Sequence, residues 1–351
     1  MDSISFIIPM HNAVSYINAC LCSVYGQLYD VSRVNVQVCV FDDASTDDSA
    51  EIVRGWQQKM QDRGIQLVLV ETSANRPAIG CGGARNRAIA ASTGQYLCLL
   101  DADDQCAPDR LTEQLSVARA DHNLLVGSAF KRDPHDATPR YRRWACGLSP
   151  KQLQTQIYTS HGPTLIAPTW FMHRSLFDRV GPFNQSHVSR YPEDLDWFYR
   201  CLDVGAGLYR VDKELVVYRL HSACASYSIP ASTLFDIRLD RFSRVVLSGW
   251  SKFTIWNAGR AGRAFFKSLS PDLQGKVTCM CDIDANKIDR GVYEVYDDRS
   301  RTVTHRIPIV CYKEVTPPVV VCMKLDMTDG QFEGNLSSMN WIEGVDYYIF
   351  N

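Results

Sequence analysis

The sequence predicts an α/β fold with a central, mostly parallel sheet, followed by a second and smaller α/β domain. From residue 3 to residue 100, short apolar runs of strand length alternate with helix-length segments, the order typical of βαβ units. The same strand–helix–strand order begins again at Phe253, after a helical stretch. We therefore expect a first domain over residues 1–228, a helical linker over 229–249 and a small domain over 250–351.

The elements of the first domain are predicted from their hydrophobic spacing. Ser45 or Thr46 is placed to cap the second helix. Apolar runs predict strands over 3–9, 35–41, 66–71 and 96–100, and the intervening segments predict helices over 13–25, 46–62 and 83–92. Beyond residue 104 we expect helices over 108–120, 150–158 and 192–202, strands over 124–130 and 215–220, and a basic loop after the first of these strands.

The composition is that of a soluble globular protein. Of the 351 residues, 46% are hydrophobic and 22% are charged, and the net charge of −2 argues against a globally basic nucleic-acid-binding protein. The 13 cysteines are scattered through the chain, which predicts reduced thiols rather than disulfides or a structural zinc site. The N-terminus enters the first strand without a signal peptide, and no apolar run approaches the length of a membrane span. We therefore expect a cytoplasmic protein with no membrane partner.

The segment from Tyr96 to Asp104 carries the strongest chemical signal. Its apolar run leads directly into three carboxylates, those of Asp101, Asp103 and Asp104. The carboxyl end of a strand is where an open α/β sheet places ligands. Like charges this close repel unless a cation or a proton lies between them, and carboxylate oxygens favour Mg²⁺ or Mn²⁺ held jointly with a substrate phosphate. The alternative is a solvated acidic turn.

Two further strand ends and one helix start are expected beside this acidic turn. His11 and Asn12 follow the first strand, and Asp43 ends the second. There Asp43 would accept a hydrogen bond from a nucleobase and His11 would pack on the base, although capping of the next helix also explains the carboxylate. The glycine-rich entry to the third helix, with Arg85, favours an anion such as a diphosphate.

Several motifs in order resemble the inverting glycosyltransferases of family 2, which have the GT-A fold. The resemblance is carried by segments 5–12, 41–49, 83–91, 96–111, 177–183, 192–197 and 218–222. It implies a nucleotide-sugar-binding domain that uses a UDP-sugar donor and Mn²⁺ or Mg²⁺. It also implies donor-binding residues Pro9, His11, Asn12, Asp43, Arg85, Asp101 and Asp103, metal ligands Asp101, Asp103 and His221, and a catalytic base, Asp194.

These implied roles agree with the chemistry of the reaction. An inverting transfer needs a base for the acceptor hydroxyl and a Lewis acid for the departing diphosphate. Asp194 stands at the head of a predicted helix, where it would equally offset the helix dipole. For His221, a structural hydrogen bond is the alternative to metal binding.

Within that family, the layout near residues 162–171 and 256–260 resembles the branch that transfers galactose from UDP-galactose to queuosine in the anticodon of cytosolic tRNA-Tyr. The segment from Lys131 to Trp144 interleaves basic and aromatic residues, which contact phosphates and stack on unpaired bases in RNA-binding proteins, although a solvated charged loop has the same composition. The candidate acceptor-binding residues are Glu193, Arg140, Arg142, Arg143, Trp144 and Trp170. Two other functions remain open: a UDP-N-acetylglucosamine-dependent β-1,3-N-acetylglucosaminyltransferase acting on a glycan or protein, and a nucleotide-sugar- or RNA-binding scaffold.

The small C-terminal domain is predicted to be Rossmann-like. A strand leads into Gly259-x-x-Gly262 and a helix, and the next strand ends at Asp282. The full G-x-G-x-x-G fingerprint is absent, so a bound dinucleotide and an oxidoreductase activity rest on the glycine pair alone. Arg260, with Arg263 and Lys267 at helical spacing, would form a local phosphate-contacting face, and a packing module is the alternative.

Overall fold

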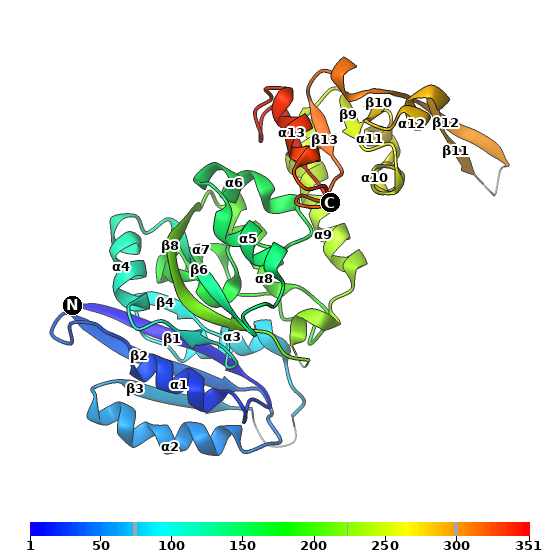
Figure 1. Ribbon diagram of the computed structural model, residues 1–351. Coiled ribbons are helices and arrows are strands. Elements are labelled where there is room, and N and C mark those ends of the chain that lie inside the picture. The colour runs from blue at the N-terminus through cyan, green and yellow to red at the C-terminus, as the bar shows by residue number, and fades with distance from the viewer. Residues whose placement is uncertain (73–75, 223, 298–300) are drawn as a thin grey trace. The chain divides into compact units, whose positions relative to one another are not determined.

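The fold is described from a computed structural model of the chain, over residues 1–72, 76–222, 224–297 and 301–351. The chain forms two compact units, each with its own sheet. The first comprises residues 1–153 and 163–230, and the second comprises residues 154–162 and 231–351. The predicted α/β fold class is confirmed, and both units contain helices interspersed with strands (Figure 1).

The first unit is built on an eight-stranded sheet with the order β3-β2-β1-β4-β7-β6-β8-β5. Strands β3, β2, β1 and β4 are parallel to one another and β6 is parallel to β8, while β7 and β5 pair with their neighbours in the antiparallel sense, so the sheet is mixed. The strands are β1 (Asp2–Met10), β2 (Val34–Asp42), β3 (Gln66–Glu71), β4 (Tyr96–Leu99), β5 (Gln105–Cys106), β6 (Leu124–Asp133), β7 (Phe171–His173) and β8 (Gly207–Arg219).

Helices cover both faces of this sheet. They are α1 (Ile17–Tyr25), α2 (Ser49–Asp62), α3 (Gly80–Ala90), α4 (Arg110–Ala120), α5 (Pro139–Gly147), α6 (Pro150–Thr155), α7 (Arg174–Val180) and α8 (Glu193–Asp203). Alternate residues of β1, such as Ile4 and Phe6, share one buried cluster with apolar residues of α1, α2 and α4. Helix α3 packs on β1 and β2, and its buried residues do not belong to that cluster, so it covers the other face. Burial on both faces explains why β1 and β2 are almost continuously apolar.

The structure corrects the expected loop after β6. Residues 131–133 continue β6, because this strand pairs with the 13-residue strand β8 over its whole length. Residues 139–147 then form helix α5, which begins with Pro139 in its first turn, a position where the fixed φ of proline favours helix entry. The basic residues between 131 and 143 are therefore distributed over a strand end and a helix rather than one loop.

The second unit has a six-stranded sheet with the order β11-β12-β10-β9-β13-β14. Its strands are β9 (Phe253–Trp256), β10 (Val277–Asp282), β11 (Val292–Asp297), β12 (Thr302–Cys311), β13 (Val319–Val321) and β14 (Tyr347–Ile349). Its helices are α9 (Ala231–Val245), α10 (Arg260–Ser268), α11 (Pro271–Gln274), α12 (Ala285–Arg290) and α13 (Gln331–Ser338). Strand β9 is parallel to both of its neighbours. The next strands in the sequence, β10 to β12, lie on one side of β9 and the last two, β13 and β14, lie on the other, so the strand order reverses at β9, as in a Rossmann-like sheet.

Helix α9 belongs to the second unit through its packing. Phe242 of α9 is fully buried and contacts the ring of Tyr158 at a centroid distance of 4.8 Å. Arg241 donates a hydrogen bond of 2.7 Å to the Tyr158 hydroxyl. A short segment from the first half of the chain therefore completes the core of the second unit.

All 13 cysteines are free thiols, as predicted. Burial raises the pKa of several of them, including Cys39 and Cys98, to about 12, so these thiols remain protonated at neutral pH. Among the helices of the described residues, none combines the length and the apolar character needed to cross a membrane.

Candidate functional site

The strand ends predicted to carry chemistry lie at one edge of the first sheet. In the parallel register, Met10 of β1 stands opposite Asp42 of β2, and Ile7 stands opposite Leu99 of β4. The residues that follow these strands, from His11, Asp43 and Asp101 onward, therefore leave the sheet at the same edge.

Three carboxylates converge in the turn after β4. Asp101, Asp103 and Asp104 each offer an oxygen within 4.8 Å of the others. Asp104 is fully buried, and its Oδ2 has no hydrogen-bond partner among the described residues. Burial, with Asp103 and Asp101 adding to it, raises the pKa of the Asp104 carboxyl well above its usual range.

Asp103 joins the acidic turn to the end of β8. The Nε2 atom of His221 donates a hydrogen bond of 2.9 Å to Asp103 Oδ2, and the imidazole stacks on Tyr16 at 4.6 Å. Burial and the charge of Asp101 raise the pKa of Asp103, whereas the hydrogen bond from His221 lowers it. Asp103, His221 and Cys224 form a second group whose potential ligand atoms lie within 4.8 Å of one another.

These residues fit a divalent cation. Clustered carboxylates, two of them (Asp103 and Asp104) with raised pKa values, and an unpartnered carboxylate oxygen are what a site for a positive ion requires. The oxygen-rich set with one imidazole suits Mn²⁺ or Mg²⁺. Asp103 and His221 would hold the ion, with Asp101 as a further carboxylate ligand.

Arg219, to which the sequence assigned no role, fixes the shape of the acidic turn. Its backbone N–H donates to Asp104 Oδ1 at 2.8 Å, and its Nη1 donates to the backbone oxygen of Asp103 at 2.7 Å. Its Nε pairs with Asp133 at 3.0 Å. An arginine more than a hundred positions away is invisible to local sequence reasoning, and the resemblance at residues 218–222 was the one signal that pointed to it.

Arg85 does not lie free at a helix N-terminus as expected for a diphosphate ligand. It is only 3% exposed, and it donates to Asp101 at 2.8 Å and to Glu193 at 2.7 Å. The glycines before it, Gly80 and Gly82, serve packing: a Cβ on either would lie within 2.5 Å of a backbone oxygen of segment 184–188. Arg85 therefore links the acidic turn to the start of α8.

Asp194 lies in the first turn of α8, next to Glu193. Its Oδ1 accepts the backbone N–H of Leu195 at 2.7 Å. Burial and the neighbouring Glu193 charge raise the pKa of Asp194 to about 6, against the lowering effect of Arg85. Part of the residue remains exposed. A carboxylate with this pKa is ionised at neutral pH and basic enough to accept a proton.

The residues expected at the nucleobase are held in one hydrogen-bonded group. His11 Nδ1 donates to the backbone oxygen of Asp43 at 2.6 Å, and Asn12 Nδ2 donates to His11 Nε2 at 3.2 Å. Both oxygens of Asp43 accept backbone N–H groups, of Ile79 and Gly80, at 2.8 Å. Asp43 thus caps the entry to α3 rather than the following helix α2, which was the alternative left open by the sequence, and it retains lone pairs for one further donor. Pro9 is buried inside β1, and His11 and Asn12 are exposed.

The candidate acceptor residues fall into different environments. Trp170 is fully buried and stacks among Trp197, Phe183 and Phe198, so it belongs to the core and does not reach an acceptor in this structure. Arg142 pairs with Glu214 and hydrogen-bonds to the backbone. Trp144 packs in a cluster beneath α5, and Glu193 holds Arg85.

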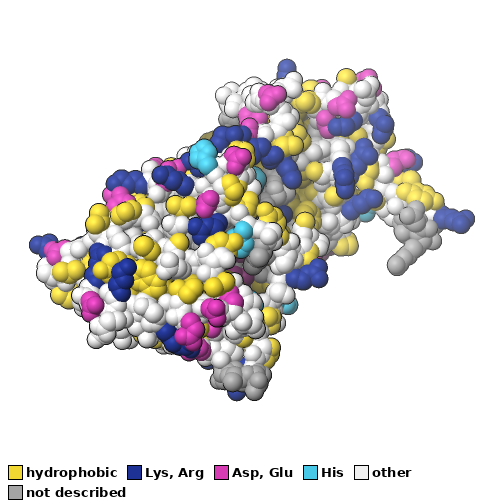
Figure 2. All heavy atoms as spheres, turned by 60° about the horizontal axis from the view of Figure 1, so that its bottom comes forward, with side chains coloured by type: hydrophobic (Ala, Val, Ile, Leu, Met, Phe, Trp, Pro, Cys, Tyr) yellow, Lys and Arg dark blue, Asp and Glu magenta, His cyan; other side chains and the backbone are white. Residues whose placement is uncertain are grey.

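Arg140 and Arg143 lie on α5, Arg140 half-buried and Arg143 exposed. On the face that Figure 2 shows, Lys and Arg side chains form small groups separated by hydrophobic and acidic ones.

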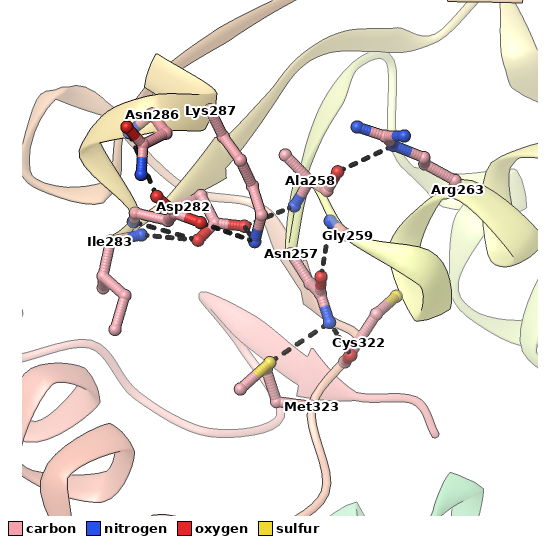
Figure 3. Close-up of polar contacts among 11 residues, drawn as sticks. Asn257, Ala258, Gly259, Arg263, Asp282, Ile283, Asn286, Lys287, Cys322 and Met323 are labelled. Atoms are coloured by element: carbon pink, nitrogen blue, oxygen red, sulfur yellow. Dashed lines mark hydrogen bonds and ion pairs between the residues drawn. The ribbon is translucent and has the colours of Figure 1, made fainter. Parts of the chain in front are cut away.

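In the turn that follows β9, polar groups form hydrogen bonds with side chains and backbone of the same unit (Figure 3). Asp282, where a dinucleotide-binding domain places a ribose-binding acid, accepts from the Ala258 N–H and from Lys287 Nζ, both at 2.9 Å. Its other oxygen accepts two backbone N–H groups of the following turn. Asn257 spans the switch point, with its amide donating to the backbone oxygen of Cys322 at 2.9 Å. These contacts favour the packing module over a nucleotide site.

Comparison with known proteins identifies a family for the first part of the chain. The chain matches the family described as "Glycosyl transferase family 2" over residues 5–181, just over half of its length. An uncharacterized glycosyltransferase of Haemophilus influenzae is 34% identical over 126 residues, which are 36% of this chain and 46% of that protein. The amylovoran biosynthesis glycosyltransferase AmsB of Erwinia amylovora is 38% identical over 117 residues, 33% of this chain and 35% of that protein. The chain thus spans less than half the length of these two relatives.

Solved structures share the fold at low identity. The crystal structure of S. aureus TarS aligns with a TM-score of 0.53 and 16% identity, over 79% of this chain and 51% of that chain. TarS 1-349 in complex with UDP-GlcNAc aligns with a TM-score of 0.51 and 17% identity, over 78% of this chain and 72% of that chain. From the family match over residues 5–181, the chain belongs to glycosyl transferase family 2.

Proposed function

We propose that this protein is an inverting, metal-dependent glycosyltransferase that uses a UDP-sugar donor and Asp194 as its general base. The observation that carries the proposal is the bridge made by Arg85, which pairs with Asp101 on one side and with Glu193, next to Asp194, on the other. This bridge holds the carboxylate turn proposed to bind the cation and a carboxylate with a pKa of about 6 in one site. The UDP-GlcNAc complex of the structural relative TarS supports a UDP-sugar as the donor class.

The residues of the chain divide the reaction between donor and acceptor. Asp43 and His11, with Asn12 and Pro9 beside them, bind the uridine end. Asp103, His221 and Asp101 would hold Mn²⁺ or Mg²⁺, which when bound stabilises negative charge on the departing diphosphate. Asp194 accepts the proton of the acceptor hydroxyl, so that oxygen attacks the anomeric carbon from the face opposite the diphosphate. Inversion at the anomeric carbon follows.

We propose galactose as the sugar and queuosine in the anticodon of a cytosolic tRNA, tRNA-Tyr, as the acceptor, in the cytoplasm. The sequence resemblance around residues 162–171 and 256–260 supports this choice, and so do the basic and aromatic side chains on α5 and its flanks. N-acetylglucosamine is the second candidate for the sugar, because TarS was solved with UDP-GlcNAc.

A turnover assay with all four combinations of donor and acceptor tests these proposals. The protein is incubated with Mn²⁺, with UDP-galactose or UDP-N-acetylglucosamine, and with total tRNA that contains or lacks queuosine. We expect one added hexose on queuosine, detected by mass spectrometry of nucleosides, with UDP-galactose only. Transfer of N-acetylglucosamine would favour the second donor. UDP-sugar binding without any transfer or hydrolysis would refute tRNA as the acceptor and favour a binding scaffold.

A further inference from the structure

Arg132 is a buried cation at the carboxyl end of β6. It is 7% exposed and stands opposite Tyr218 of β8 in the parallel register. Its guanidinium carbon lies 4.2 Å from the ring centroid of Tyr218, 5.3 Å from that of Tyr141 and 5.4 Å from that of Phe130. Three aromatic rings thus surround the charge, and neither neighbour along the strand, Lys131 or Asp133, is buried with it.

The hydrogen bonds available within the chain do not satisfy Arg132. Its Nε donates to Thr138 Oγ1 at 3.0 Å. Its Nη1 is buried and has no acceptor in the described residues, and no carboxylate of those residues lies within ion-pair distance of it. Because arginine stays protonated in proteins, a buried guanidinium without a counter-ion is unfavourable, and cation–π contacts offset only part of that penalty. The geometry therefore calls for an anionic acceptor.

The position of Arg132 is next to the proposed reaction site. Tyr218, which stacks on it, precedes Arg219, whose backbone N–H donates to Asp104 at 2.8 Å. On the other side, Tyr141 lies close enough to Asp194 for that carboxylate to contribute to the raised pKa of the phenol, which burial chiefly causes. Arg132 therefore lies between two rings: Tyr218, whose neighbour Arg219 binds the acidic turn, and Tyr141, which lies near the proposed base Asp194.

We propose that Arg132 binds a phosphate oxygen beside the point of sugar transfer. This inference rests on the proposed function, in which two phosphate-bearing molecules meet here: the UDP-sugar and a tRNA. The phosphate belongs either to the donor diphosphate or to the acceptor backbone, and both present the same anionic oxygen to the guanidinium. The rings around the guanidinium restrict its rotation, so the site is preorganised for one such contact.

Binding measurements on Arg132→Met and Arg132→Lys test this. Arg210→Met is the matched control, because Arg210 has a similarly buried side chain, also contacts α5 and has partners at Asp212 and at the backbone oxygen of Ala145. Calorimetry with Mn²⁺ measures the affinity of each variant for UDP and for uridine, which lacks phosphate. Filter binding measures the affinity of each variant for total tRNA.

We expect Arg132→Met to weaken UDP binding by about 10- to 100-fold with uridine unchanged, the effect of one charge-assisted hydrogen bond. Arg132→Lys should recover part of this loss, and it carries the same comparison if Arg132→Met does not fold. Unchanged UDP binding with weakened tRNA binding would assign the phosphate to the acceptor. Variants that bind UDP and tRNA like the wild type, and lose only thermal stability as Arg210→Met does, would overturn the inference. A wild type that binds no UDP with Mn²⁺ would instead refute the proposed function itself.

Discussion

Replacing Asp194 with asparagine tests two effects of this carboxyl: its role as a base in the transfer reaction, and the stability that the folded protein loses when it is ionised. Asparagine preserves the volume and the oxygen that accepts the Leu195 N–H, but it cannot accept a proton. General-base catalysis contributes about 10²- to 10⁴-fold to rate, so we expect the transfer rate of Asp194→Asn to fall by that factor. Donor binding should persist within about twofold, because the donor contacts proposed above do not include Asp194.

The pKa of Asp194 predicts the pH dependence of both rate and stability. The wild-type transfer rate should rise with pH through about 6, because the base acts only when deprotonated. In the folded state this pKa is higher than the ordinary aspartate value of 3.8, so the folded protein binds more protons between these pH values. Stability should therefore fall as the pH rises from about 4 to about 6. The full shift is worth about 3 kcal/mol, an upper value because Asp194 is partly exposed.

Asp194→Asn should remove this penalty. At pH 8 the variant should unfold at a higher urea concentration than the wild type, and at pH 4 the two should agree. The assays are urea denaturation at both pH values, UDP calorimetry with Mn²⁺, and UDP release during transfer. Two results would refute the assignment of the base: an Asp194→Asn protein that keeps the wild-type transfer rate, or one that loses transfer because it no longer binds UDP.

Three other substitutions, one of them paired with a control substitution, test separate parts of the structure. Asp103→Ala should abolish the Mn²⁺ dependence of UDP affinity in calorimetry, and a retained dependence would contradict the metal assignment. Arg85→Met breaks two buried ion pairs, so it should cost about 3 kcal/mol in urea unfolding; it should also shift the acid limb of the rate profile upward, because Arg85 lowers the pKa of Asp194. Gly262→Ala places a Cβ 1.9 Å from a backbone oxygen and should cost about 1–3 kcal/mol by thermal unfolding, whereas Gly334→Ala, in open space, should cost nothing. Equal effects of these two glycine substitutions would argue against the close helix–strand packing.

Sequence reasoning succeeded where a residue's environment depends on its own element. The carboxyl end of β4 could be predicted from an apolar run followed by aspartates, and the parallel register brings Asp43 to the same edge. It failed where partners come from distant segments. Nothing near Arg85 in the sequence shows that Glu193, 108 positions away, will take one of its nitrogens. Trp170 was expected at an acceptor, but its core packing is set by Phe183 and Trp197.

The segment after β6 shows a second reason for failure. The cluster of basic residues predicted a loop, because composition was the only local signal and the pairing with β8 is not visible in the sequence. In the structure Lys131, Arg132 and Asp133 extend a strand, since β8 is long enough to pair with all three. Strand length here is decided by a partner about 85 residues later in the chain, and a single sequence does not specify that partner.

The path of the chain between the two units limits where this protein can be cut into separate domains. The polypeptide crosses between them after Leu153, after Gly162 and after Pro230, so the second unit is not a tail added at one junction. Cutting at the predicted linker would leave Tyr158 in one fragment and its partner Phe242 in the other. A fragment that ends before α9 would expose an aromatic side chain that the intact chain buries, and a fragment that begins there would have a gap in its core. Gain, loss or exchange of the C-terminal sheet during evolution would thus have required matching changes at residues 154–162, inside the first half of the sequence.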